Sequence, residues 1–158
     1  LAKRNQSLKS VQIQFSLLAP DLEKQYQVKK ICKANNIDFF AYSPLSFGIL
    51  CIDPDKEENK EKSFIRNALF ENYKKPTYEL RRCLKKIANQ RSVSQAQVAI
   101  NWCCYQGTVP LVGMRKKSQV IDVSNVFKWN LNKKEFKLLQ EVSKSCLKKM
   151  PKNPFSSI

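Results

Sequence analysis

The sequence predicts an α/β fold in which short, buried strands alternate with helices. Segments typical of strands occur at residues 11–18, 37–42 and 109–112, and a segment with helical spacing of apolar residues follows each of them. Strands that are joined through helices run parallel and are covered by those helices. A chain of 158 residues is long enough to enclose one substantial core, so we expect a single domain.

The first strand and helix are predicted near the N-terminus. Residues 11–18 (VQIQFSLL) alternate and are rich in β-forming side chains, and Pro20 is expected to end this strand. Asp21 is suited to cap the helix that follows, which we expect to end at Asn35-Asn36. The apolar stripe of this helix consists of Val28, Ile31 and Cys32.

A second strand and a long charged segment come next. The run 37–42 (IDFFAY) is nearly continuously apolar, as expected for a strand that is buried on both faces of a parallel sheet. Residues 53–62 (DPDKEENKEK) are almost wholly charged, and we predict a charged surface loop over residues 53–75. Helical spacing returns over residues 78–91, with the apolar positions Leu80, Cys83, Leu84 and Ile87.

A further helix and the third strand follow. Ser94 and Gln97 have the spacing of a capping box for a helix that continues to Tyr105, and Gly107 is expected to stop it. The apolar run 109–112 (VPLV) then predicts a strand.

The last part of the chain predicts two more helices, the first beginning near Ser118. Asn132 and Glu135 have the spacing of a capping box for the second. Residues 148–158 are expected to form a frayed basic tail. The apolar face of the last helix consists of Phe136, Leu139, Val142 and Cys146.

The charge of the chain implies attraction to phosphates or acidic surfaces. It carries 29 Lys and Arg against 13 Asp and Glu, a formal net charge of +16. Specific nucleic-acid binding is not favoured, because the cations are spread along the whole chain and neither a zinc-ligand spacing nor an RNA-reading aromatic motif accompanies them. No apolar run approaches the length that a membrane helix needs.

Cysteine and histidine usage restricts the chemistry further. The six cysteines contain no C-x-x-C pair, so we expect neither a metal site nor a disulfide framework, and Cys83, Cys103 and Cys146 fall on apolar helix positions. This pattern favours a reducing compartment, cytoplasmic or plastid-like, and not secretion. Histidine is absent, which removes the commonest general base. The start at Leu1 is interpreted as the start of a piece of a longer protein.

One motif predicts an anion site. Residues 113–119 (GMRKKSQ) directly follow the third strand and open a helix. A strand that leads through Gly into a helix start points backbone N–H groups at a ligand, and neighbouring cations suit a phosphate. The alternative is a solvated basic turn.

Three parallel strands do not close a barrel, and an open sheet leaves its edges unpaired unless other chain covers them. The order Tyr42-Ser43-Pro44-Leu45, Gly48-Ile49-Leu50, residues 94–103 (SQAQVAINWC) and residues 109–113 (VPLVG) with Gln119 resembles the aldo-keto reductase superfamily, most closely its plant and bacterial NADPH-dependent members. The resemblance covers residues 11–142. It implies the C-terminal part of a (β/α)8 TIM barrel, its last three strands, incomplete in this chain.

The resemblance also implies a cofactor, NADP(H), and a small carbonyl substrate for the intact enzyme. Gln12 would hydrogen-bond the nicotinamide carboxamide, and Tyr42 would stack on the nicotinamide ring. Asp122 would lie near the adenine. The residues that would line the pyrophosphate channel are Ser43, Pro44, Leu45, Ser46 and Phe47. Those that would surround the 2′-phosphate are Gly113, Met114, Arg115, Lys116 and Gln119.

Structural alternatives exist for these positions. Tyr42 could be an ordinary core aromatic, and Gln12 could satisfy a neighbouring backbone group. Trp102 and Cys103 lie in a well-matched stretch but are interpreted as packing residues.

The sequence also departs from the family. No catalytic residue is assigned here, because the family's Asp, Tyr, Lys and His lie in the first half of its barrel. Asp53 stands where relatives often carry a Lys directed at the cofactor phosphates, and Val123 replaces an Asn that meets the adenine. We therefore expect the NADP(H)-binding half of a reductase that is inactive by itself. The alternative is a catalytically inactive, reductase-like protein that binds a nucleotide or a protein partner.

Overall fold

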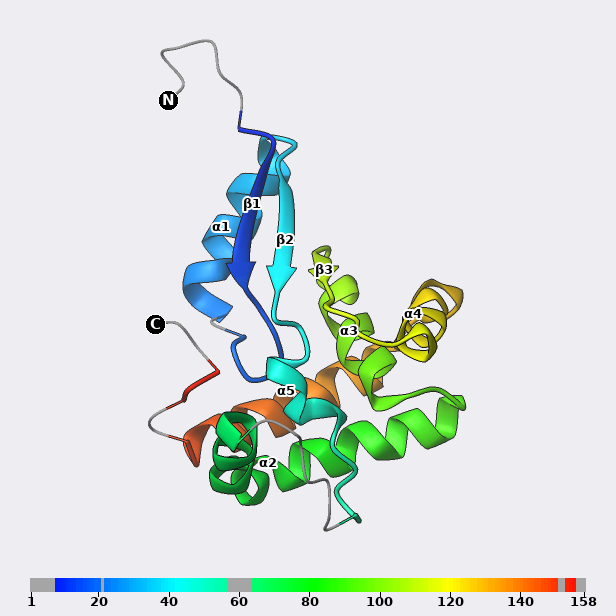
Figure 1. Ribbon diagram of the computed structural model, residues 1–158. Coiled ribbons are helices and arrows are strands. Elements are labelled where there is room, and N and C mark those ends of the chain that lie inside the picture. Colours follow the sequence, from blue (N-terminus) through cyan, green and yellow to red (C-terminus); the bar gives the residue numbers. More distant parts are fainter. Residues whose placement is uncertain (1–7, 21, 57–63, 151–152, 156–158) are drawn as a thin grey trace.

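The computed structural model describes residues 8–20, 22–56, 64–150 and 153–155, with the backbone alone for 22–26 and 64–69. Three parallel strands form one sheet in the order β1 (Ser10–Gln14), β2 (Asp38–Tyr42), β3 (Val109–Leu111). The helix α1 (Leu22–Ala34) connects β1 to β2. The predicted α/β fold with parallel strands is confirmed, and Figure 1 shows β1 and β2 side by side, with β3 next to the end of β2.

The pairing register decides which side chains share a face of the sheet. Gln14 pairs with Tyr42, and Tyr42 pairs with Leu111, so these residues form one row at the C-terminal ends of the strands. Because side chains alternate along a strand, Gln12, two residues before Gln14, lies on the same face. Phe39 and Ala41 lie on the opposite face and are buried in the core.

The first strand is shorter than predicted, because it ends at Gln14 and a turn follows. The Ser16 Oγ accepts the backbone N–H groups of Leu18 at 3.2 Å and of Ala19 at 3.1 Å. A hydroxyl that satisfies these groups locally offers the backbone an alternative to the sheet ladder. The proposed cap Asp21 lies outside the described residues.

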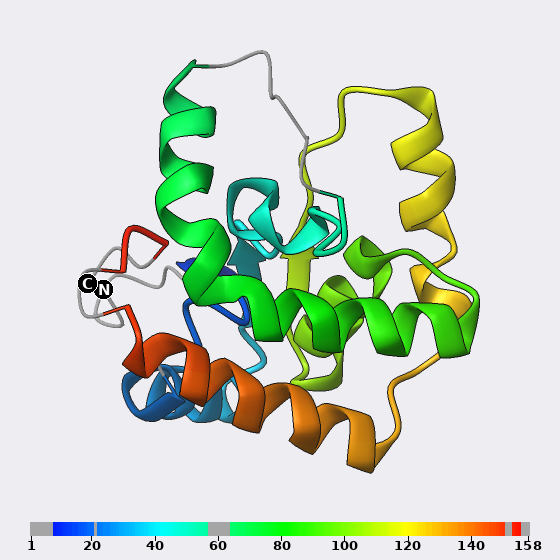
Figure 2. The ribbon, with the colours of Figure 1, turned by 90° about the horizontal axis from the view of Figure 1, so that it is seen from below.

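The helix α2 (Phe64–Arg91) begins much earlier than the predicted residue 78, so the charged loop that was expected over residues 53–75 is wrong from residue 64 onward. Pro76 lies inside this helix, where it removes a backbone donor, and Figure 2 shows α2 bending sharply. Side chains also bond to backbone carbonyls near the bend. The Thr77 Oγ1 donates to the Tyr73 carbonyl at 2.6 Å, and an Arg81 Nη donates to the Lys74 carbonyl at 2.8 Å.

The helix α3 (Gln95–Tyr105) begins and ends as predicted, with one difference. Ser94 accepts the Gln97 N–H at 3.1 Å, but the Gln97 side chain does not complete the capping box, because it bonds to Asp122 and Trp129 instead. Gly107 follows the helix with a left-handed φ of 73°, which favours glycine.

The helices α4 (Lys117–Ser124) and α5 (Lys133–Lys148) complete the chain, with the short 3₁₀ segments η2 (Ser46–Cys51) and η3 (Val126–Lys128). The predicted capping box of α5 is confirmed: Asn132 accepts the Glu135 N–H at 2.9 Å, and Glu135 accepts the Asn132 N–H at 2.8 Å. Figure 1 shows α2 and α5 lying across the end of the sheet toward which the strands run.

The core lies between the sheet and these helices. Trp102 is fully buried and stacks on Phe15 with 5.2 Å between ring centroids, which confirms its interpretation as a packing residue; Cys103 is also fully buried. The expected fraying of the tail does not hold for its described part. Phe155 is fully buried, and the Asn153 side-chain amide donates to the Leu18 carbonyl at 2.6 Å.

Candidate functional site

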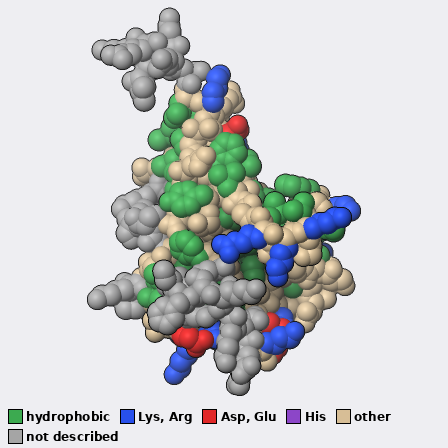
Figure 3. All heavy atoms as spheres, in the orientation of Figure 1, with side chains coloured by type: hydrophobic (Ala, Val, Ile, Leu, Met, Phe, Trp, Pro, Cys, Tyr) green, Lys and Arg blue, Asp and Glu red, His purple; other side chains and the backbone are tan. Residues whose placement is uncertain are grey.

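The C-terminal ends of the strands bring together the first group of predicted site residues. Tyr42 has 36% of its surface exposed, on the sheet face shared with Gln12 and Gln14. Figure 3 shows hydrophobic side chains along the strand region of one face and Lys and Arg side chains beside them, toward α4. An exposed aromatic ring beside amide side chains at the ends of parallel strands is a suitable platform for a flat, polar ring.

Gln14 is a further candidate site residue that the sequence did not predict. It is 8% exposed and lies in the row of Tyr42, whereas the predicted Gln12 is exposed and pairs with Phe40, one step farther from the strand ends. The signal was present as the period of two that places both glutamines on one face. The positions of Gln12 and Gln14 relative to Tyr42 depend on the strand register, which cannot be read from the sequence.

The loop after β2 holds an unusual backbone. Ser43, Ser46 and Phe47 have left-handed φ angles of 53°, 48° and 59°, and Gly48 follows with 100°. Left-handed conformations of non-glycine residues are costly and persist where the surroundings enforce them, often at functional sites. The loop therefore presents its backbone in a shape that a relaxed chain would not keep.

A pair of hydroxyls enforces this shape. The Ser46 Oγ lies 2.9 Å from the Ser16 Oγ, and both side chains are buried, so Ser46 ties the β2 loop to the turn after β1. Because the Ser46 side chain makes this contact, only the Ser46 backbone could line a channel. Of the other predicted channel residues, Pro44 is buried, Leu45 is half-buried, and Phe47 is 51% exposed beside Phe155, with ring centroids 6.3 Å apart.

The basic turn after β3 is open to solvent over residues 113–119, including Met114. Two of the N–H groups that we expected to be free are occupied: the Gln119 Oε1 accepts those of Arg115 at 2.8 Å and Lys116 at 3.0 Å. Gly113 has no left-handed φ, and a Cβ atom added there would meet nothing within 4 Å. Among the described residues, neither strain nor crowding explains this glycine, and the space beside it is open.

Asp122 is held by α3 rather than presented to solvent. One carboxylate oxygen accepts from the Ser94 Oγ and the other from the Gln97 Nε2, both at 2.6 Å. The Gln97 Oε1 accepts in turn from the Trp129 indole N–H at 3.1 Å. This network fixes α4 behind the basic turn, so Asp122 supports the turn from the far side.

Asp53, whose charge was expected to repel a cofactor phosphate, has a partner. Its Oδ1 lies 2.5 Å from the Lys85 Nζ on α2, and Asp55 lies 2.8 Å from the same ammonium. The hydrogen bond from Lys85, with that from the Asp55 N–H, lowers the pKa of Asp53 below its ordinary value. The negative charge of Asp53 is therefore compensated by Lys85 on α2.

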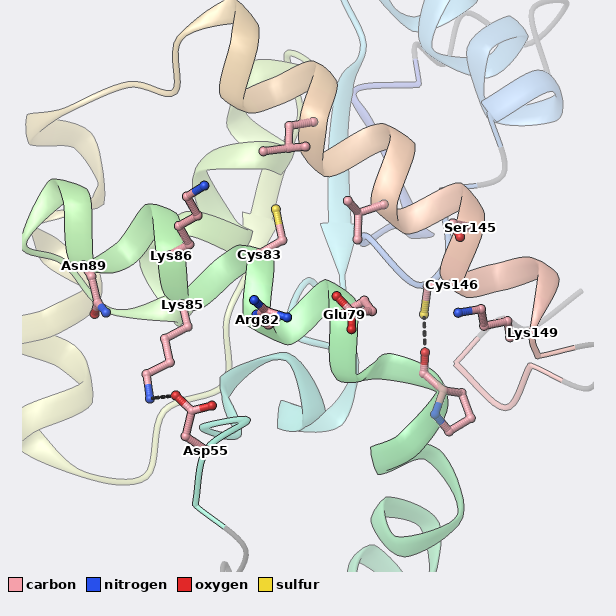
Figure 4. Close-up of a pocket in the computed structure, with 13 residues that line it drawn as sticks. Asp55, Glu79, Arg82, Cys83, Lys85, Lys86, Asn89, Ser145, Cys146 and Lys149 are labelled. Carbon is pink, nitrogen blue, oxygen red and sulfur yellow. Dashed lines mark hydrogen bonds and ion pairs between the residues drawn. The ribbon is translucent and has the colours of Figure 1, made fainter.

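A separate groove lies between α2 and α5 (Figure 4). Cys83 and Cys146 line it, and burial raises the pKa of each thiol to about 11. The Cys146 Sγ lies 3.3 Å from the Pro76 carbonyl oxygen. Thiols that stay protonated at neutral pH are poor nucleophiles, so these cysteines are packing residues. Within the described residues, no group of three or more Cys, Asp or Glu could hold a metal ion.

Comparison with known proteins matches this arrangement to one family. The model of the aldo/keto reductase family matches residues 2–144. The chain belongs to the aldo/keto reductase family. Pyridoxal reductase of Arabidopsis thaliana, a chloroplastic protein, is similar to it, with 34% identity over 157 residues, 99% of this chain and 42% of the relative. The chain thus spans less than half the length of this relative.

Solved aldo/keto reductases share its fold. A thermostable aldo-keto reductase in complex with the inhibitor epalrestat has a TM-score of 0.63 and 17% identity, and the match covers 89% of this chain and 42% of that one. A mutant protein in complex with NADPH has a TM-score of 0.61 and 16% identity, covering 89% and 40%. The three-stranded parallel sheet is therefore part of an aldo/keto reductase TIM barrel. Among the described helices, none is both long and apolar enough to cross a membrane.

Proposed function

We propose that this chain is the NADP(H)-binding part of an aldo/keto reductase that reduces aldehydes or ketones. The observation that supports it best is the solvent-exposed turn with Arg115 and Lys116 beyond β3, together with the exposed Tyr42 in register with the end of that strand. A ring platform and a cationic turn at the same edge of a parallel sheet suit the two ends of a dinucleotide.

The residues present fit this cofactor. Space at Gly113 allows backbone to approach a phosphate, and the adjacent guanidinium and ammonium groups suit the dianionic 2′-phosphate. Gln119 shapes the turn, and Asp122 anchors it to α3. When bound, NADPH supplies the hydride. Tyr42 would stack on its nicotinamide, with Gln12 or Gln14 at the carboxamide.

The left-handed loop after β2 would hold the pyrophosphate through its backbone. Peptide N–H groups that are fixed before binding lose little freedom when an anion arrives. The Ser16–Ser46 hydroxyl pair keeps this loop in place, and the pairing of Asp53 with Lys85 reduces the repulsion that Asp53 would exert on a phosphate.

Pyridoxal is our first substrate to test, because a relative with 34% identity is a pyridoxal reductase. We also propose a reducing compartment, cytosolic or plastid, since all six cysteines lie in described residues and are free thiols. A second candidate, a catalytically inactive nucleotide-binding or interaction protein, rests on Val123, which lacks the polar group that the family presents to the adenine.

The test is the preference for NADPH over NADH. In the parent chain we expect NADPH to bind at least about tenfold more tightly, because the cations meet a phosphate that NADH lacks. Arg115→Ala with Lys116→Ala should abolish this preference with little change for NADH. Titration calorimetry measures both constants.

A matched control removes two exposed lysines at the start of another helix, Lys133→Ala with Lys134→Ala, and should keep the preference. Equal affinity of the parent chain for the two nucleotides would contradict the proposal. Tight binding of DNA or RNA that falls steeply with salt would favour a nucleic-acid function instead.

A further inference from the structure

Arg81 is a buried cation that forms no ion pair with a carboxylate among the described residues. Its side chain is 3% exposed, and its donors reach the Thr77 Oγ1 at 3.2 Å, the Lys74 carbonyl at 2.8 Å and the Ile52 carbonyl at 3.5 Å. All of these acceptors are neutral, and none of the ion pairs among the described residues includes Arg81. Burial lowers its pKa, and the charge of Asp53, which is paired with Lys85, only partly offsets this effect.

Arg81 is one of the residues that line an open pocket of about 700 Å³. The pocket lies between the segment after η2, the bend of α2 and the end of α5. Among the described lining residues, four lysines accompany Arg81, against two glutamates, of which Glu71 forms an ion pair with Lys74. The lysines are Lys56, Lys74, Lys75 and Lys149.

Much of the remaining wall is apolar. Tyr78, Pro54 and Pro76 contribute rings, and Tyr78 is 37% exposed. A ligand here would therefore meet a flat apolar surface on one side and an excess of positive charge on the other.

We propose that this pocket binds a small organic dianion, a phosphate monoester of an aromatic ring. The phosphate would add a negative charge beside Arg81, whose hydrogen-bond acceptors are neutral and whose guanidinium keeps N–H groups beyond those used on the three oxygens. The ring would pack on Tyr78 and the prolines. None of the lining residues that the structure describes belongs to the turn after β3 or to the strand ends, so this site is separate from the proposed cofactor site.

Arg81 also has a structural task, because it bonds the Lys74 carbonyl beside the Pro76 bend. A substitution of Arg81 could therefore unfold the chain. The lysines of the rim allow a cleaner test: Lys56 and Lys75 are exposed, and neither forms an ion pair among the described residues.

The experiment titrates the chain with phenyl phosphate and follows backbone amide and Arg Nε–H signals by NMR. We expect saturable shifts at Arg81 and in the bend of α2, and no saturation with phenol. Lys56→Gln with Lys75→Gln should weaken binding at least about fivefold, because two nearby cations are lost.

The matched control is Arg82→Gln. Arg82 is the exposed neighbour of Arg81 and lines the other groove of α2 (Figure 4), so its loss should change the affinity less than about twofold. NADPH should not displace phenyl phosphate. Absence of saturation, an unchanged affinity in the double lysine variant, or competition by NADPH would each overturn this site. None of these outcomes bears on the proposed cofactor site, which the preference for NADPH over NADH tests separately.

Discussion

Around the basic turn, some residues hold the backbone in place and others remain available to contact a ligand. Asp122 and Gln119 both turn inward, one to α3 and the other to the backbone of the turn, while Arg115 and Lys116 remain in solvent. Such a division is expected at a binding site, because a contact group is effective only when its neighbours hold it in position.

Gly113→Ala tests whether the space at this glycine belongs to a ligand. The free energy of unfolding should stay equal or rise by up to about 1 kcal/mol, because alanine restricts the unfolded chain and its Cβ meets no atom within 4 Å here. NADPH affinity should fall about tenfold or more, since the methyl group blocks close approach. Urea unfolding and calorimetry measure the two effects. Unchanged NADPH affinity would remove Gly113 from the site.

Asp122→Ala tests the anchor of α4. Loss of the two hydrogen bonds to the carboxylate should lower the free energy of unfolding by about 2 kcal/mol, because Gln97 is buried and keeps an unsatisfied amide. Glu141→Ala, an exposed acid on α5, serves as control and should change stability by less than about 0.5 kcal/mol. A double-mutant cycle with Gln97→Ala should give a nonzero coupling energy.

Among the elements, α2 and α5 show how capping and tertiary contacts decide helix boundaries. A proline usually ends a helix, but α2 continues through Pro76 because Thr77 and Arg81 satisfy nearby carbonyls. The start of α5 is fixed locally by Asn132 and Glu135 and tied to the end of α2 by the bidentate pair of Arg91 and Glu135, at 2.9 Å for both bonds.

The pH dependence of stability should report this pair. Burial raises the pKa of Glu135, but hydrogen bonds from Arg91 and the Asn132 N–H outweigh it, so this pKa lies below its ordinary value of 4.5. A carboxyl whose pKa is lowered on folding stabilises the fold above its unfolded pKa, and this contribution is lost as the pH falls through the folded value. Glu135→Gln should therefore cost about 1 kcal/mol at pH 7 and progressively less below about pH 4.

Urea unfolding of both chains across this pH range gives the comparison. Glu141→Gln, on the exposed side of the same helix, should leave the pH profile unchanged. A parallel offset between the parent and Glu135→Gln at every pH would show that Glu135 acts only as a neutral cap.

The whole molecule is an open segment of a barrel. Val109 and Leu111 on β3 are 46% and 37% exposed, and Phe127 is 79% exposed. Strand edges and apolar side chains of this kind are covered in a closed barrel. The chain holds no residue that we can assign as proton donor, and it contains no histidine.

Carbonyl reduction should therefore be absent when this chain alone is mixed with NADPH and pyridoxal. NADPH consumption, followed by its absorbance, should not exceed that of a sample without protein. Binding of NADPH in the same sample, measured by calorimetry, is the positive control. Turnover that scales with protein concentration would contradict the prediction that this chain lacks the catalytic groups.

The amino-acid sequence alone determined the α/β alternation, the caps at Ser94 and Asn132 and the basic motif after β3, because periodicity, capping and glycine placement act over a few neighbouring residues. Tertiary structure decided the rest. Which glutamine stands beside Tyr42 depends on strand register, and the carboxylate of Asp122 is claimed by a helix 25 residues earlier in the chain. Such partners meet only when distant segments pack together, and no local pattern encodes that meeting.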